Sequence, residues 1–299
     1  MGFAYLGELA GLGTAVCWTV TSMSFEAAGK RVGSLAVNLI RLVMALLVLA
    51  LVNWARRGLI WPLDASGHAW LWLSVSGIVG FTIGDLCLFR AFVLIGARLS
   101  MLMMSLVPLI TALGSWLIIG ERLEWLEWLG MALTLTGVAW VVLERQPDPA
   151  GRGRRPPLRG VLLGMGGAAG QALGLVLSKY GMGDYDALAA NQIRVFSGML
   201  AYCLLFCVIG WWSRVGQALR HPSGMGFTAL GAFFGPFLGV SLSLLAVQNT
   251  EAGVAATLMA LVPVIILAPA RLIQREPISP RAVGGALLAV AGSALLFLT

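Results

Sequence analysis

Long runs of apolar residues alternate with short polar breaks along the whole chain. A helix needs roughly 20 apolar residues to cross a hydrocarbon core about 30 Å thick. Ten runs of about that length predict ten membrane-spanning helices: Leu6–Gly29, Leu35–Ala55, Ala69–Ile95, Ala97–Ile119, Leu126–Leu143, Arg159–Lys179, Leu188–Trp212, Phe227–Val247, Ala252–Ile273 and Pro280–Phe297. The breaks between them are rich in Gly and Pro, which favour turns. We therefore expect an all-α integral membrane protein.

The chain contains one apolar segment twice. At an offset of 155 residues, Phe81–Glu121 aligns with Pro236–Glu276. The match is best where the sequence MSLVPLI, beginning at Met104, meets MALVPVI, beginning at Met259. Such self-similarity over most of the chain indicates an internal duplication.

The duplication divides the chain into two halves. We expect a first five-helix repeat over residues 1–143, an Arg/Pro-rich linker over 144–158 and a second five-helix repeat over 159–299. Because five is an odd number, the two repeats must cross the membrane in opposite directions. Inverted repeats are typical of secondary transporters, in which both halves share a central site.

Composition agrees with a membrane protein and excludes several other classes. The chain is 59% hydrophobic and 11% charged, and its 38 glycines are typical of helices that pack closely in lipid. Much of the net charge of +7 lies in the segment Glu144–Arg159, where five Arg stand against two acidic residues, so it does not indicate a nucleic-acid partner. All four cysteines lie in apolar runs, and no Cys/His spacing predicts a metal site. We expect no cofactor, and a monomer or homodimer in the inner or plasma membrane.

Loop charges predict the orientation of the chain. Lys and Arg residues are more numerous after the odd-numbered predicted helices than after the even-numbered ones. By the positive-inside rule, the linker is then cytoplasmic and both termini lie outside.

Two arginines inside predicted spans are candidates for a substrate site. A charged residue at the bilayer centre costs at least about 2.5 kcal/mol, so it is a functional candidate by default. Arg41 and Arg194 each lie three residues after an asparagine, Asn38 or Asn191. These matched residues predict a polar, cationic lining of a central cavity. The alternative is that each arginine extends to the membrane surface and bonds a loop carbonyl.

The third predicted helix contains both Asp85 and Arg90. Their spacing of five residues rotates them apart by about 140°, so we do not expect them to bond each other. Burial near mid-membrane would favour the protonated form of Asp85, as proton coupling requires. A structural partnership with one of the arginines is the alternative. Arg90 is nearer the helix end, where extension to the surface is favoured over a role in gating.

Three further matched pairs are candidates for gating, substrate contact and hinge motion. Glu26 and Lys179 lie late in the first and sixth helices, where opposite charges would form a gate or merely mark two helix ends. Trp18 and Gln171 lie in the middle of the same helices. The indole ring would contact substrate or pack between helices, while the amide must find a partner within the bundle. Pro108 and Pro263 predict hinges in the fourth and ninth helices.

Several of these residues together resemble a known family. The resemblance rests on Trp18, Arg41, Pro108, the turn Gly120-Glu121-Arg122-Leu123 and Leu126-x-x-x-Gly130, and on Arg194, Pro263, Glu276 and Gly285 in the second half. In this combination the chain resembles EamA-type ten-helix members of the drug/metabolite transporter superfamily. The resemblance implies a cavity surrounded by helices 1 to 4 and 6 to 9, and cytoplasmic termini, opposite to the charge-based orientation. Arg90 and Glu26 depart from the usual family pattern.

The resemblance and the buried charges together predict a secondary active transporter. We expect an exporter of amino acids or similar small polar metabolites, with proton coupling through Asp85. Alternatives within the superfamily are an organic-anion or phosphorylated-metabolite exchanger and a multidrug exporter. Outside transport activity, a channel or membrane scaffold is the alternative. No Ser/His/Asp, Cys/His or paired-carboxylate motif occurs, so we do not expect an enzyme.

Overall fold

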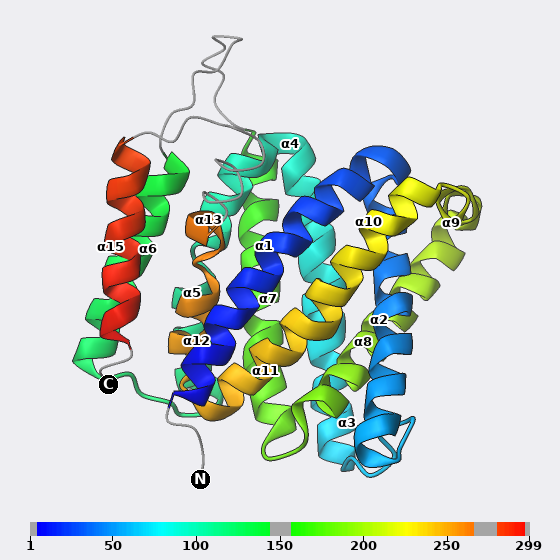
Figure 1. Cartoon of the computed structure of the whole chain (residues 1–299), viewed down its shortest axis with the longest axis horizontal. Coiled ribbons are helices and arrows are strands. Elements are labelled where there is room, and N and C mark those ends of the chain that lie inside the picture. The colour runs from blue at the N-terminus through cyan, green and yellow to red at the C-terminus, as the bar shows by residue number, and fades with distance from the viewer. Residues whose placement is uncertain (1–4, 144–156, 266–279, 297–299) are drawn as a thin grey trace.

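The computed structural model describes residues 5–143, 157–265 and 280–296, and every regular element within them is a helix (Figure 1). The elements are α1 (Leu6–Val32), α2 (Ser34–Arg57), α3 (Gly67–Gly77), η1 (Ile78–Gly84), α4 (Asp85–Met104), α5 (Val107–Ile118), α6 (Trp125–Leu143), α7 (Leu158–Met182), α8 (Ala187–Ile209), α9 (Trp212–Leu219), α10 (Pro222–Ala232), η2 (Phe233–Gly239), α11 (Val240–Asn249), α12 (Ala252–Met259), α13 (Val262–Ile265) and α15 (Pro280–Leu295). The two η elements are π-helical segments that continue directly into the α-helices on either side. The all-α prediction is confirmed.

Within the described residues, five helical segments are long and apolar enough to cross a membrane. They are Ser34–Arg57, Gly67–Leu88, Leu158–Met182, Ala187–Ile209 and Pro222–Asn249. Their length and composition make this a multi-pass membrane protein. The other predicted spans either correspond to helices that are too short or not apolar enough, or include residues that the structure does not describe.

Several structural features recur at the offset of the predicted duplication. The π-helical segments η1 and η2 occupy equivalent places in the two halves, 155 residues apart. The helix breaks at Ser105–Leu106 and Ala260–Leu261 are separated by the same offset. Matched helices run in opposite directions: α1 begins at the end of the bundle marked N, whereas its counterpart α7 ends there (Figure 1). We call this the termini end, because α15 also finishes at it.

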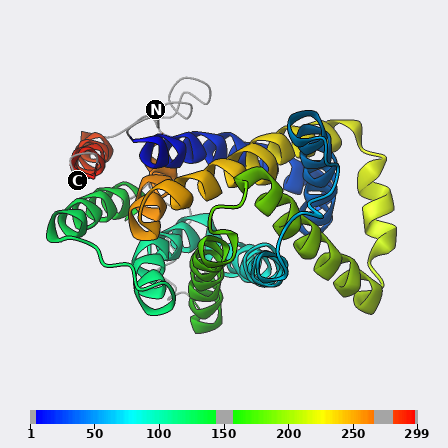
Figure 2. The same ribbon diagram turned by 90° about the horizontal axis from the view of Figure 1, so that it is seen from below.

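Helices of the two halves interlock, so the halves do not form separate bodies. The segment α3–η1–α4 packs along α7, α2 packs on α8, and α1 lies against α10, η2 and α11. The α5 helix contacts both α7 and α12. The α6 and α15 helices pair with each other at one edge (Figures 1 and 2). Helices from both halves therefore surround the interior.

Glycines let α7 approach η1 closely. A Cβ atom at Gly170 would lie 2.6 Å from the Cα of Gly84, and one at Gly174 would lie 3.1 Å from the Cα of Gly80. Close backbone approach through small residues is a common way for helices to associate in lipid. This approach brings the middle of α7 next to the π-helical segment.

Two predicted helix boundaries are wrong. Helical backbone continues past Ile95 to Met104, so the structure has no helix end there. This helix is not straight, because a Cβ at Gly164 would lie within 4 Å of side-chain atoms of both Ala91 and Met103, which would be roughly 18 Å apart in a straight helix. The predicted fourth helix begins only at Val107, so Pro108 lies in its first turn. The helix is therefore interrupted before Pro108 rather than kinked at it. Proline is tolerated there because first-turn N–H groups have no helical partner.

We predict that Gly170→Ala destabilises the protein, because its methyl group would overlap the backbone of Gly84. Overpacking of this kind costs about 1–3 kcal/mol. The change should appear as a lower melting temperature of the purified protein in detergent. Gly226→Ala is the matched control, because Gly226 is also helical and a Cβ atom there would meet nothing within 4 Å. An equal effect of both substitutions would contradict close packing of α7 on η1.

Candidate functional site

A buried ion pair joins α2 to α4. The Arg41 guanidinium contacts the Asp85 carboxylate, and the two side chains are only 10% and 8% exposed. Gln171 of α7 donates a hydrogen bond of 2.8 Å to the other carboxylate oxygen. The guanidinium also lies 5.2 Å from the centre of the Phe25 ring on α1. Four helices from both halves thus contribute to one charged cluster, which we call the Arg41–Asp85–Gln171 cluster.

The π-helical segment η1 positions this cluster. Asp85 directly follows η1, and its backbone N–H reaches carbonyls of both Gly80 and Thr82. A π-turn offsets the following side chains from the regular helical spacing, and such turns are frequent at functional sites. The Gln171 amide also lies 3.5 Å from the Gly80 carbonyl oxygen. Asp85 and Gln171 therefore depend on the same local backbone geometry.

Arg194 of α8 has a different environment from its counterpart Arg41. Its guanidinium lies 5.1 Å from the centre of the Phe81 ring, and it forms no hydrogen bond or ion pair with any described residue. The Arg194 backbone contacts Gly77, which precedes Asp85 by eight residues. At 1.5 Å per residue, this places the two backbone positions roughly 12 Å apart along the helix. The Arg194 backbone is therefore not level with Asp85 along this helix.

The matched asparagines also differ. The Asn191 amide donates to the Pro236 carbonyl at 2.8 Å and lies 3.0 Å from the Ser241 hydroxyl oxygen. It thereby satisfies a carbonyl within η2, where Pro236 interrupts the regular bonding pattern. Asn38 is fully buried, and neither of its amide atoms has a partner among the described residues.

Trp18 packs where α1 meets η2. A Cβ atom at Gly239 would lie 3.0 Å from the Trp18 Nε1 atom, and the indole ring contacts two buried apolar clusters. This environment is that of a ring between helices. Arg90 is exposed, as its predicted extension to the surface requires. The side chains of Glu26 and Pro263 lie outside the described residues, and Pro263 occupies the second position of α13.

Lys179 pairs with Glu121, which precedes α6. Its ammonium group also donates to the Thr250 carbonyl at 2.6 Å. The Glu121 carboxylate accepts from the Ser115 hydroxyl and, at 3.1 Å, from the backbone N–H of Ala252. These contacts join the first half to the second at the termini end. The sequence indicates Glu121 only as part of the Gly120–Leu123 turn, and that turn is the signal that could identify it as a functional residue.

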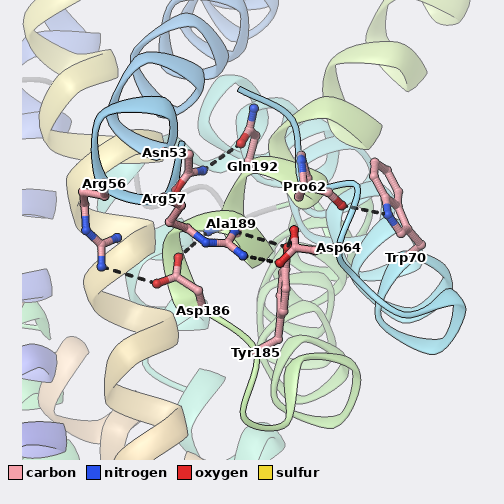
Figure 3. Close-up of polar contacts among 10 residues, drawn as sticks. All are labelled: Asn53, Arg56, Arg57, Pro62, Asp64, Trp70, Tyr185, Asp186, Ala189 and Gln192. Carbon is pink, nitrogen blue, oxygen red and sulfur yellow. Dashed lines mark hydrogen bonds and ion pairs between the residues drawn. The ribbon is translucent and has the colours of Figure 1, made fainter. Parts of the chain in front are cut away.

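A second polar network joins the halves at the termini end (Figure 3). Asp64, in the loop before α3, pairs with Arg57 and accepts a 3.0 Å hydrogen bond from the Tyr185 hydroxyl. Nearby, Arg56 lies 3.4 Å from Asp186, and Asn53 donates to Gln192 at 2.7 Å. We call the Lys179–Glu121 pair and the Arg57–Asp64–Tyr185 group the termini-end lock.

We predict that Arg41→Met destabilises the protein by about 3–5 kcal/mol, because it leaves the buried Asp85 carboxylate without a cation. Replacing both partners, as Arg41→Met with Asp85→Leu, should recover most of that loss. Unfolding of the purified variants in detergent would measure both effects. If the double variant were as unstable as the sum of the single variants, Arg41 and Asp85 would not be coupled.

We predict that the Glu121 contribution to stability is lost in acid. Burial raises the pKa of its carboxyl, but Lys179, Ser115 and the Ala252 N–H outweigh burial and hold the pKa below its ordinary value of 4.5. Glu121→Gln should therefore cost about 1–3 kcal/mol at neutral pH. The difference from the wild type should shrink as pH falls below about 4.5.

Melting temperatures measured from pH 7 to pH 3 would test this prediction. Glu124→Gln, at an exposed position in the same loop, is the control and should change stability little at any pH. A wild-type advantage over Glu121→Gln that grows in acid would contradict the assignment.

Comparison with known proteins identifies the family. The EamA-like transporter family matches residues 5–143 and 158–298. The chain is 26% identical over 192 residues to the "Uncharacterized transporter YvbV" of Bacillus subtilis (strain 168), covering 63% of this chain and 59% of the relative. A solved crystal structure has the same fold, with a TM-score of 0.76 and 17% identity over 97% of this chain and 94% of that one. The protein belongs to the EamA-like transporter family, whose members are transporters rather than enzymes.

Proposed function

We propose that this protein is a secondary active transporter that moves small polar metabolites by alternating access through a ten-helix bundle. The observation that carries the proposal is the buried Arg41–Asp85–Gln171 cluster, which joins helices of both halves in the bundle interior. Ionisable groups inside spanning helices are costly and mark substrate or ion pathways. Export from the cell is the direction we propose, with amino acids as the first substrate class.

Polar contacts between the halves support a closed gate at the termini end. The Lys179–Glu121 pair and the Arg57–Asp64–Tyr185 group are partly exposed to solvent. Partly exposed ion pairs contribute modestly to stability, so they can break and re-form during a transport cycle. In this proposal Lys179 keeps the gating role expected from the sequence, with Glu121 as its partner.

Matched irregular segments supply places where the helices can bend. The η1 and η2 segments and the breaks before Val107 and Val262 recur at equivalent positions. Each is a short departure from regular α-helix, and such departures allow bending without loss of the flanking helices. Because the halves interlock, we propose that the moving bodies contain helices from both halves.

Asp85 is the residue we propose for proton coupling. When ionised, its carboxylate pairs with Arg41 and accepts from Gln171. Protonation of Asp85 would remove the negative charge from that ion pair and weaken the contact between α4 and α2. The protonation state of Asp85 would thereby alter the contact between α2 and the helices around η1.

The direct test is uptake into proteoliposomes loaded with amino acids or with phosphorylated metabolites, with and without an imposed pH gradient. We expect amino acid counterflow that rises with the gradient in the wild type. Asp85→Asn should retain exchange at equal pH but lose most of the response to the gradient, because it cannot exchange a proton. Asp184→Asn, at an exposed loop position, is the control. Absence of flux for every compound, with correctly folded protein, would contradict the transport proposal.

A further inference from the structure

Arg194 is a buried cation that lacks a counter-ion in the described part of the protein. Only 5% of the residue is exposed, and its Nε atom is enclosed without a hydrogen-bond partner. Its counterpart Arg41 pairs with Asp85, but the position equivalent to Asp85 in the second half is Val240. An enclosed charge without a partner lowers stability, so its presence calls for a functional reason.

The described neighbours of the Arg194 guanidinium include no polar side chain that bonds to it. Phe81 covers it at 5.1 Å, measured to the ring centre. Gly80 lies on another side, where a Cβ atom would be 3.5 Å from the Nη2 atom. The Gln171 amide reaches the carbonyl oxygen of the same glycine at 3.5 Å. Gly80 therefore lies next to both the Arg194 guanidinium and the Gln171 amide of the Arg41–Asp85–Gln171 cluster.

Charge balance selects the kind of ligand that suits this position. Arg41 and Asp85 neutralise each other, so Arg194 contributes one uncompensated positive charge. A single carboxylate would balance it and can accept two parallel hydrogen bonds from the planar guanidinium. A doubly charged phosphate would leave an excess negative charge in the same enclosed space, which is unfavourable.

We infer that Arg194 forms a single-anion subsite that binds the carboxylate group of the transported solute, with Arg41 reserved for Asp85. The identification of that ligand as the transported solute rests on the proposed transport function. The binding site itself rests on the unpaired guanidinium between Phe81 and Gly80.

The test measures how small anions change the melting temperature of the purified full-length protein. Isobutyrate is the carboxylate probe, isobutyramide is its neutral analogue of similar shape, and inorganic phosphate is the multiply charged anion. A ligand that binds only the folded state raises the melting temperature. We expect the wild type to bind isobutyrate at least tenfold more tightly than either of the other two compounds.

Arg194→Met should remove the isobutyrate response and should raise the melting temperature of the ligand-free protein, because it eliminates an unpaired buried charge. Arg214→Met is the matched control. Arg214 also lies over an aromatic ring, 4.5 Å from the centre of Trp211, but it is exposed. We expect this control to keep the wild-type isobutyrate response.

Three results would overturn the inference: an unchanged isobutyrate response in Arg194→Met, an equal response of the wild type to isobutyrate and isobutyramide, or tighter binding of phosphate. Arg194→Lys provides a second test that keeps the charge if Arg194→Met fails to fold. It should bind isobutyrate at least fivefold more weakly, because lysine lacks the planar fork. Equal affinity in Arg194→Lys would also overturn the inference.

Parallel flux measurements separate this inference from the proposed function. Flux in the wild type together with isobutyrate binding that does not depend on Arg194 would overturn the subsite alone. Isobutyrate binding that depends on Arg194, in a protein without flux for any compound, would support the binding site and contradict transport.

Discussion

The charge of Asp85 must be neutralised by the protein itself, and this requirement shapes the Arg41–Asp85–Gln171 cluster. Asp85 can remain ionised in the bundle because Arg41 and Gln171 both bond its carboxylate. That arrangement needs α2, α4 and α7 to lie together, which in turn needs the close approach of Gly170 to Gly84. The glycines thus permit the close helix packing that brings the Asp85 carboxylate to Gln171 and Arg41.

The two halves resemble each other in sequence, but their interiors differ. In the first half, Arg41 forms an ion pair with Asp85, and the Asn38 amide has no partner among the described residues. The second half bonds its asparagine to the Pro236 carbonyl and leaves Arg194 unpaired within the described part of the chain. A site with an identical pair of cations would attract multiply charged ligands. The divergence between halves instead leaves one net positive charge.

Sequence patterns predict the helical fold and which polar residues lie inside it, because apolar length and internal repetition are local signals. They do not predict which residues meet. Lys179 bonds Glu121, a contact set by the packing of α5 and α12 against α7, and no spacing in the sequence encodes it. Pro108 likewise predicts a kink within one helix, whereas the chain is broken before it. The break lies at Ser105–Leu106, so Pro108 falls in the first turn of the next helix. The sequence alone does not decide between a kink and a break, because proline is compatible with both.

The central claim is that the Arg41–Asp85–Gln171 cluster can be reached from each side of the membrane in turn. The most direct measurement is labelling of a cysteine at position 171, in a protein whose four native cysteines are replaced, with an impermeant thiol reagent applied to either side of oriented vesicles. We predict reaction only from the side opposite the termini end, and reaction from the termini end once Glu121→Gln and Asp64→Asn weaken the lock. Equal labelling from both sides in every variant, or a position that neither side can reach, would contradict alternating access.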